Sequence, residues 1–140
     1  MTQNHPEIRE AVRALCAGFP GEYWRALDRE RAYPTEFVRA LTKAGYLAVL
    51  IPEEFGGSGL GIAEASAILE EIHKSGCNGG ACHAQMYIMG TLLRHGNEEQ
   101  KRCYLPGIAS GELRGKEEDR NPVLDHLTGA DISPFEAVRH

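Results

Sequence analysis

The segment at positions 50–61, LIPEEFGGSGLG, has the composition of a binding loop, because four glycines follow an apolar run. Glycine-rich loops can hold nucleotide phosphates through backbone N–H groups. A dinucleotide loop, however, needs G-x-G-x-x-G at a strand end, and a P-loop ends in Gly-Lys-Ser/Thr, where this chain has Leu60, Gly61 and Ile62. Glu53 and Glu54 would also repel phosphate. We therefore interpret the segment as an irregular connector whose glycines permit unusual backbone angles.

A second group of side chains has the chemistry of a soft metal site. His73, Cys77, Cys82 and His83 lie within eleven residues, and a structural zinc ion accepts such ligands. They lack the paired short knuckles of strong zinc motifs, so we expect no metal site. Nothing in the sequence around Cys82 indicates the lowered thiol pKa of a nucleophile. No carboxylate has a partner at a spacing typical of acid–base catalysis, and we assign no catalytic residue.

The composition of the whole chain excludes several classes of partner. The 140 residues fit one domain, and a net charge of −5 with scattered lysines and arginines gives no basic stripe for nucleic acid. The N-terminus has no apolar signal segment, and no apolar run approaches the ~20 residues of a membrane-spanning helix. The four cysteines are expected to be reduced thiols. We expect a soluble, cytoplasmic protein that binds neither nucleic acid nor membrane.

The spacing of apolar residues predicts an all-α fold, an antiparallel bundle of about six helices. The expected helices cover positions 5–17, 22–31, 34–44, 62–74, 81–95 and a segment that starts at Asn97. Asn97 and Gln100 have the residue types of a capping box, and Gly45 is expected in the left-handed conformation. Pro106 should break or kink the last helix. The run YLAVLI at 46–51 is either a short strand or a buried connector.

Two of these helices carry distinctive patterns. In the helix at 62–74, one apolar stripe is expected to face the core while Glu64, Glu70, Glu71 and Lys74 point elsewhere. The helix at 81–95, ACHAQMYIMGTLLRH, is apolar on every side. We therefore expect it to be buried by neighbours all round.

The segments AGYLAVLIPEEFGGSGLGIAEASAILEEI and GACHAQMYIMGTLLRHGNEEQKRCYLPGIASGELR resemble the N-terminal helical domain of the acyl-CoA dehydrogenases. Four pieces occur in family order: the connector G-x-L-x-x-x-x-P-E-x-x-G-G-x-G, an acidic helix ending in Ser-Gly, a buried helix, and H-G-N-E-E-Q-K-x-x-Y-L-P. The resemblance covers residues 5–114. It implies an FAD-dependent enzyme that dehydrogenates acyl-CoA thioesters, with a β-domain and a C-terminal four-helix bundle following the helical domain.

The resemblance also implies where this domain meets the substrate. One side of the buried helix lines the acyl-chain pocket in the family, and the matching positions are Gly80, His83, Tyr87 and Gly90, spaced so that they share a face. The alternative to pocket lining is that each of these residues is an ordinary core or surface residue. In the family, flavin binds mainly between the other two domains, and the catalytic glutamate belongs to the C-terminal half. We therefore expect this chain to bind no cofactor by itself and to be inactive alone.

The resemblance stops after Arg114. Residues 115–140 form a divergent tail with a charged run and helix-start signals for two short helices, near 123–127 and from Phe135 onward.

A domain that packs against two others carries an apolar face, and such a face is unusual on a soluble monomer. We therefore expect self-association, and a helical interaction module is the alternative function.

Overall fold

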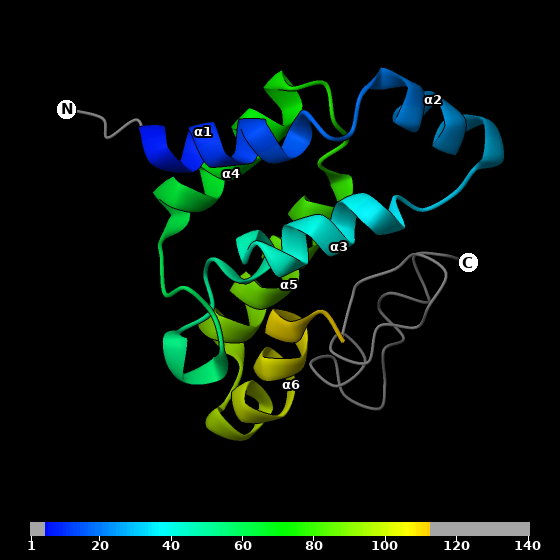
Figure 1. The fold of residues 1–140 in the computed structure, drawn as a ribbon. Helices are drawn as coiled ribbons and strands as arrows, with labels where there is room; N and C mark the ends of the chain where they lie inside the picture. The colour runs from blue at the N-terminus through cyan, green and yellow to red at the C-terminus, as the bar shows by residue number, and fades with distance from the viewer. Residues whose placement is uncertain (1–4, 113–140) are drawn as a thin grey trace.

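The computed structural model describes residues 5–112, which form six α-helices and two short 3₁₀ turns (Figure 1). The helices are α1 (Pro6–Cys16), α2 (Gly21–Glu30), α3 (Thr35–Lys43), α4 (Ile62–Lys74), α5 (Gly80–His95) and α6 (Glu98–Ser110), and the 3₁₀ turns are Tyr46–Ala48 and Glu53–Phe55. There is no strand in this range, so the predicted all-α class with about six helices is confirmed. The short helices predicted for the tail lie outside the described residues.

Helix α5 is the central element of the core. It packs against α3, α4 and α6, while α1 lies along α4 (Figure 1). The largest fully buried side chains come from α1, α3, α4, α5, α6 and the segment between α3 and α4: Val12, Phe37, Val38, Leu41, Leu47, Ile51, Ile68, Ile72, Met89, Leu92, Leu105 and Ile108. Burial of each such side chain contributes ~1.5–3 kcal/mol, and this packing fixes α5 within the domain.

The segment at 46–51 is a buried connector and not a strand. After Gly45, which adopts the predicted left-handed conformation (φ 87°), the chain makes the 3₁₀ turn Tyr46–Ala48. Leu47, Val49 and Ile51 are almost completely buried. The apolar run therefore serves the core, and it leads directly into the glycine-rich segment.

Helix α2 is anchored by aromatic side chains, since none of its residues is fully buried. The Trp24 ring meets the Phe37 ring edge-on at 4.9 Å between centroids, and the Trp24 indole N–H donates to the Phe19 carbonyl oxygen at 3.0 Å. Edge-on aromatic pairs of this kind add ~0.5–1.5 kcal/mol beyond their buried area.

Helix α6 begins as predicted but does not break where predicted. The Gln100 N–H donates to Asn97 Oδ1 at 2.8 Å, and the Asn97 N–H donates to Gln100 Oε1 at 2.9 Å, which completes the capping box. The helix then continues through Pro106 to Ser110, so it does not break there, while the alternative of a kink stays a prediction. The buried side chains of Leu105 and Ile108 hold this part of the helix against the core, and their packing outweighs the roughly 3 kcal/mol cost of an internal proline.

The prediction that α5 is buried all round is also wrong. Its buried residues are Cys82, Gln85, Met86, Ile88, Met89 and Leu92, while Gly80, His83 and Tyr87 are exposed. Tyr87 is 66% exposed, the most of any large apolar side chain on this helix. The sequence pattern did not reveal this exposed side, because tyrosine and glycine are also found at core positions. The sequence does not show that α3, α4 and α6 leave this side of the helix uncovered.

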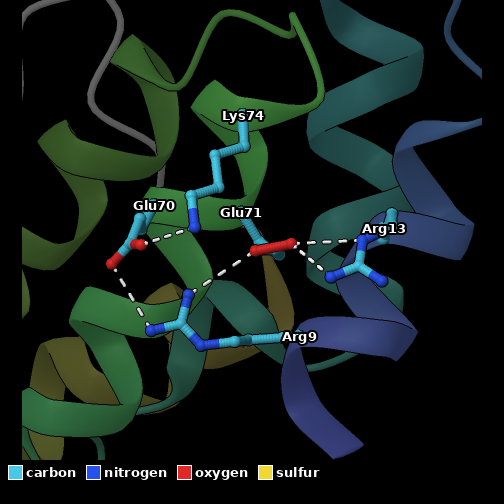
Figure 2. A network of polar contacts seen from close by, with 5 residues as sticks. All are labelled: Arg9, Arg13, Glu70, Glu71 and Lys74. Atoms are coloured by element: carbon cyan, nitrogen blue, oxygen red, sulfur yellow. Dashed lines mark hydrogen bonds and ion pairs between the residues drawn. The ribbon is translucent and has the colours of Figure 1, made fainter. Parts of the chain in front are cut away.

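A polar network joins α1 to α4 (Figure 2). Glu71, expected to point away from the core, is instead 3% exposed, so that prediction is wrong. Arg13 Nη2 donates to Glu71 Oε1 at 2.7 Å, and Arg9 Nη1 donates to Glu71 Oε2 at 3.5 Å. Arg9 also reaches Glu70 at 3.4 Å, and Lys74 Nζ pairs with Glu70 at 2.9 Å. The buried carboxylate is retained because two arginines from α1 neutralise it.

No helix within residues 5–112 is long and apolar enough to cross a membrane.

Candidate functional site

The glycine-rich connector is folded onto its own backbone. The N–H groups of residues 57–60 donate to carbonyl oxygens of the chain itself: Gly57 to Pro52, Ser58 to Ala48, Gly59 to Ile51 and Leu60 to Val49. A phosphate cradle requires amides that remain available to the ligand. The interpretation as an irregular connector is therefore confirmed.

The conformation of this connector explains its glycines. Gly56 and Gly59 adopt left-handed backbone angles, with φ 92° and 65°. Gly57 has no room for a side chain, because a Cβ there would overlap the Ile51 carbonyl group. These glycines let the chain double back tightly before α4 begins.

The four residues expected to line an acyl pocket are brought together on one side of α5. We call Gly80, His83, Tyr87 and Gly90 the α5 open face. Gly80, His83 and Tyr87 are exposed and Gly90 is half-buried, with open space where its side chain would be. The His83 and Tyr87 rings meet edge-on with centroids 6.5 Å apart. This side of the helix therefore has glycines at both ends and two rings in the middle.

The start of α5 is held in place from the preceding loop. The Gly80 N–H donates to Asn78 Oδ1 at 2.9 Å, which satisfies one of the unpaired amides of the first turn. Gly79 lies against the His73 imidazole, and a Cβ at Gly79 would come within 2.8 Å of His73 Nε2. The N-terminal end of the open face is thus fixed by contacts to α4 and its loop.

The titratable side chains of the open face are His83 and Tyr87. The face carries no carboxylate and no lysine. The neighbouring Cys82 is buried, and desolvation raises the pKa of its thiol to about 12, so it is not a thiolate at neutral pH. The interpretation of Cys82 as a buried, unreactive side chain is supported.

The residues considered as metal ligands do not converge. Cys77 and Cys82 are buried whereas His73 and His83 are exposed. Among residues 5–112, no three histidine, cysteine or acidic side chains lie close enough together to hold a metal ion. The connector amides, which could otherwise bind the phosphates of a dinucleotide, donate to carbonyl groups of the chain itself.

Sequence reasoning missed one feature of α4 and one of the loop that follows it. One is Glu71, whose sequence signal was the pair Arg9 and Arg13, one helical turn apart on α1. The other is the approach of Cys77 to the end of α1, where its thiol donates to the Cys16 carbonyl oxygen at 3.9 Å. No local sequence pattern indicates a contact between residues 61 positions apart.

Comparison with known proteins places this domain in a family. Residues 2–112 match the family model described as "Acyl-CoA dehydrogenase, N-terminal domain". The chain is 33% identical to acyl-CoA dehydrogenase FadE12 of Mycobacterium tuberculosis over 113 residues, which cover 80% of this chain and 29% of the relative. It is 32% identical to the mitochondrial isovaleryl-CoA dehydrogenase of Pongo abelii over 121 residues, covering 82% and 28%.

The match is confined to one region of these relatives, since the chain spans less than a third of their length. No solved structure matches the chain. The helical fold, the ordered motifs and the family match agree with one another. The chain belongs to the acyl-CoA dehydrogenase family, as a representative of its N-terminal helical domain.

Proposed function

We propose that this domain forms one wall of the acyl-CoA site of an FAD-dependent acyl-CoA dehydrogenase, with the α5 open face against the acyl chain. The observation that carries the proposal is the 66% exposure of Tyr87 in the middle of the central helix. An aromatic ring left in water forgoes ~1.5–3 kcal/mol of burial free energy. An acyl chain laid along α5 would recover this free energy.

The proposed reaction is the α,β-dehydrogenation of acyl-CoA thioesters. As the family resemblance implies, we assign the catalytic base and the flavin site to other domains of the enzyme. The domain contributes apolar contact and exclusion of water along the acyl chain. It is therefore expected to be inactive alone.

A chimeric enzyme tests the proposal. This chain would replace the matched N-terminal region of FadE12, and turnover of acyl-CoA substrates would be followed with an artificial electron acceptor. We expect the chimera to retain flavin and to oxidise an acyl-CoA, while this chain alone retains no flavin and shows no turnover. A folded, flavin-loaded chimera that oxidises no acyl-CoA of any chain length would contradict the proposal.

Self-association is a second candidate function, favoured by the exposure of apolar side chains. Tyr87, Ile62 and Leu60 are 66%, 72% and 42% exposed. Burying them against a second copy would gain free energy in the same way as burying them against another domain. Sedimentation equilibrium of the full chain tests this candidate: a concentration-dependent oligomer supports it, and a monomer at high concentration contradicts it.

We also propose a cytoplasmic location. All four cysteines are free thiols, as is usual in reducing compartments. Recovery of the protein in the soluble fraction of gently lysed cells is expected, and its recovery with a secreted fraction would contradict this proposal.

A further inference from the structure

Three buried thiols gather where α1 ends and α5 begins. Cys16 is the last residue of α1, Cys77 lies in the loop between α4 and α5, and Cys82 is in the first turn of α5. They are 3%, 5% and 1% exposed. The proposed acyl site uses none of these thiols, and the α1–α4 ion-pair network does not include them.

Two of the three cysteines lie against each other, through the thiol of one and the backbone of the other. The Cys77 thiol donates to the Cys16 carbonyl oxygen at 3.9 Å and to the Phe19 carbonyl oxygen at 3.7 Å, so it lies against the C-terminal end of α1.

We propose that Cys16 and Cys77 form a reversible disulfide that fastens α1 to the α4–α5 loop. A small disulfide such as oxidised glutathione is the oxidant. One protein thiolate attacks it and releases one glutathione thiol, and the second protein thiolate then displaces the other. Two protein thiols become one disulfide, two protons and two electrons pass to glutathione, and two glutathione thiols result. Disulfides of cytosolic proteins are usually transient and redox-sensing, which fits a reversible bond.

The disulfide would restrain two parts of the domain, α1 and the start of α5. It closes a long loop, because the two cysteines are 61 positions apart, and such cross-links restrict the unfolded chain. Cys77 also lies three residues before Gly80, where α5 starts. Oxidation would therefore stabilise the docking of α1 and restrain the N-terminal end of the α5 open face.

Burial makes the reaction slow in the closed fold. Desolvation, followed by the influence of Cys77, raises the pKa of Cys16 to about 12, so thiolate is scarce at neutral pH. Exchange then requires local opening of the end of α1. The bond should form faster in mild, sub-denaturing urea than in buffer.

The test is oxidation of the full chain with oxidised glutathione in sub-denaturing urea, followed by blocking of remaining thiols and non-reducing peptide mapping. We expect a Cys16–Cys77 linked peptide with the loss of two hydrogens. The midpoint of thermal unfolding should rise by roughly 10 °C or more and return when dithiothreitol is added. Cys103→Ser, which changes the exposed cysteine, should retain both effects, and Cys77→Ala should lose both.

Three results would overturn the proposal. One is glutathione attached at Cys103 with Cys16 and Cys77 still unlinked after prolonged oxidation. Another is a Cys16–Cys82 link in place of the proposed one. The third is a rise in the unfolding midpoint that persists in Cys77→Ala.

Discussion

Glu71 is the residue whose role differs most from its appearance in the sequence. It stands beside Glu70 in an acidic helix, yet one carboxylate is buried between Arg9 and Arg13 while the other remains half-exposed. The hydrogen bond from Arg13 is the main cause that holds the pKa of Glu71 below its ordinary value. Which of two adjacent glutamates turns inward depends on the position of α1, and a single helical pattern carries no information about that neighbour.

Substituting Glu71→Gln should lower the midpoint of thermal unfolding by several degrees. The amide keeps the shape of the side chain but leaves two arginines facing a neutral group. Glu70→Gln is the matched control, because its carboxylate is half-exposed and solvent-screened pairs contribute little. Circular dichroism during heating measures both variants. An equal loss in the two variants would contradict the structural role of Glu71.

Acid should weaken the contact between Glu71 and the arginines of α1 in the unmodified protein. Because the pKa of Glu71 is lowered in the folded state, its contribution is present above the ordinary value of 4.5 and is lost as the pH falls through the folded pKa. The fall in unfolding midpoint below pH 4.5 should be smaller in Glu71→Gln than in the unmodified protein. A fall of equal size in both would contradict this assignment.

Alkaline conditions should destabilise the domain through its buried thiols. The pKa values of Cys16 and Cys82 rise from 9.0 to about 12, for both chiefly because burial disfavours the thiolate. Below pH 9.0 the thiols are protonated in both states and their contribution is complete. Between pH 9.0 and about 12 the unfolded chain loses these protons first, so stability falls.

Urea denaturation across this pH range measures the effect under reducing conditions. The urea midpoint of the unmodified protein should decline more steeply above pH 9.0 than that of Cys82→Ala. Identical slopes for the two proteins would contradict the assignment to Cys82.

Among the elements, α6 shows which structural features depend on local sequence and which depend on packing. Its start could be predicted because Asn97 and Gln100 satisfy each other within one turn, and no distant residue is needed. The continuation of the helix through Pro106 could not be predicted, because Leu105 and Ile108 hold the helix through contacts with the rest of the core. For α5, an uncovered tyrosine has the same hydropathy as a buried one, so the open side was visible only in three dimensions.

Removing the cap of α6 should destabilise the domain by about 1 kcal/mol. Asn97→Ala deletes the oxygen that accepts from the Gln100 N–H at 2.8 Å, whereas Asn97→Asp keeps an acceptor at this position. Chemical denaturation gives the free energy of unfolding of both variants. Equal stability of the alanine and aspartate variants would show that the cap contributes nothing.

At the scale of the whole molecule, the ordered motifs predicted the family and the all-α class. The resemblance to the family selected Gly80, His83, Tyr87 and Gly90, and their spacing of three and four residues predicted that they share a helix side. The exposure of that side was not predictable, because it depends on how α3, α4 and α6 surround α5. The domain is thus a packed core with one side of its central helix uncovered.

The central claim is that Tyr87 contacts the acyl chain, and the kcat/KM of the FadE12 chimera towards acyl-CoA substrates of graded length tests it most directly. Tyr87→Ala should lower kcat/KM for the preferred substrate by roughly tenfold, since about 1.4 kcal/mol of lost apolar contact corresponds to that factor. Ile62→Ala removes a similarly exposed apolar side chain from α4 and should leave kcat/KM and the length preference unchanged. A folded, flavin-loaded Tyr87→Ala chimera with the same kcat/KM at every chain length as its parent would contradict the claim.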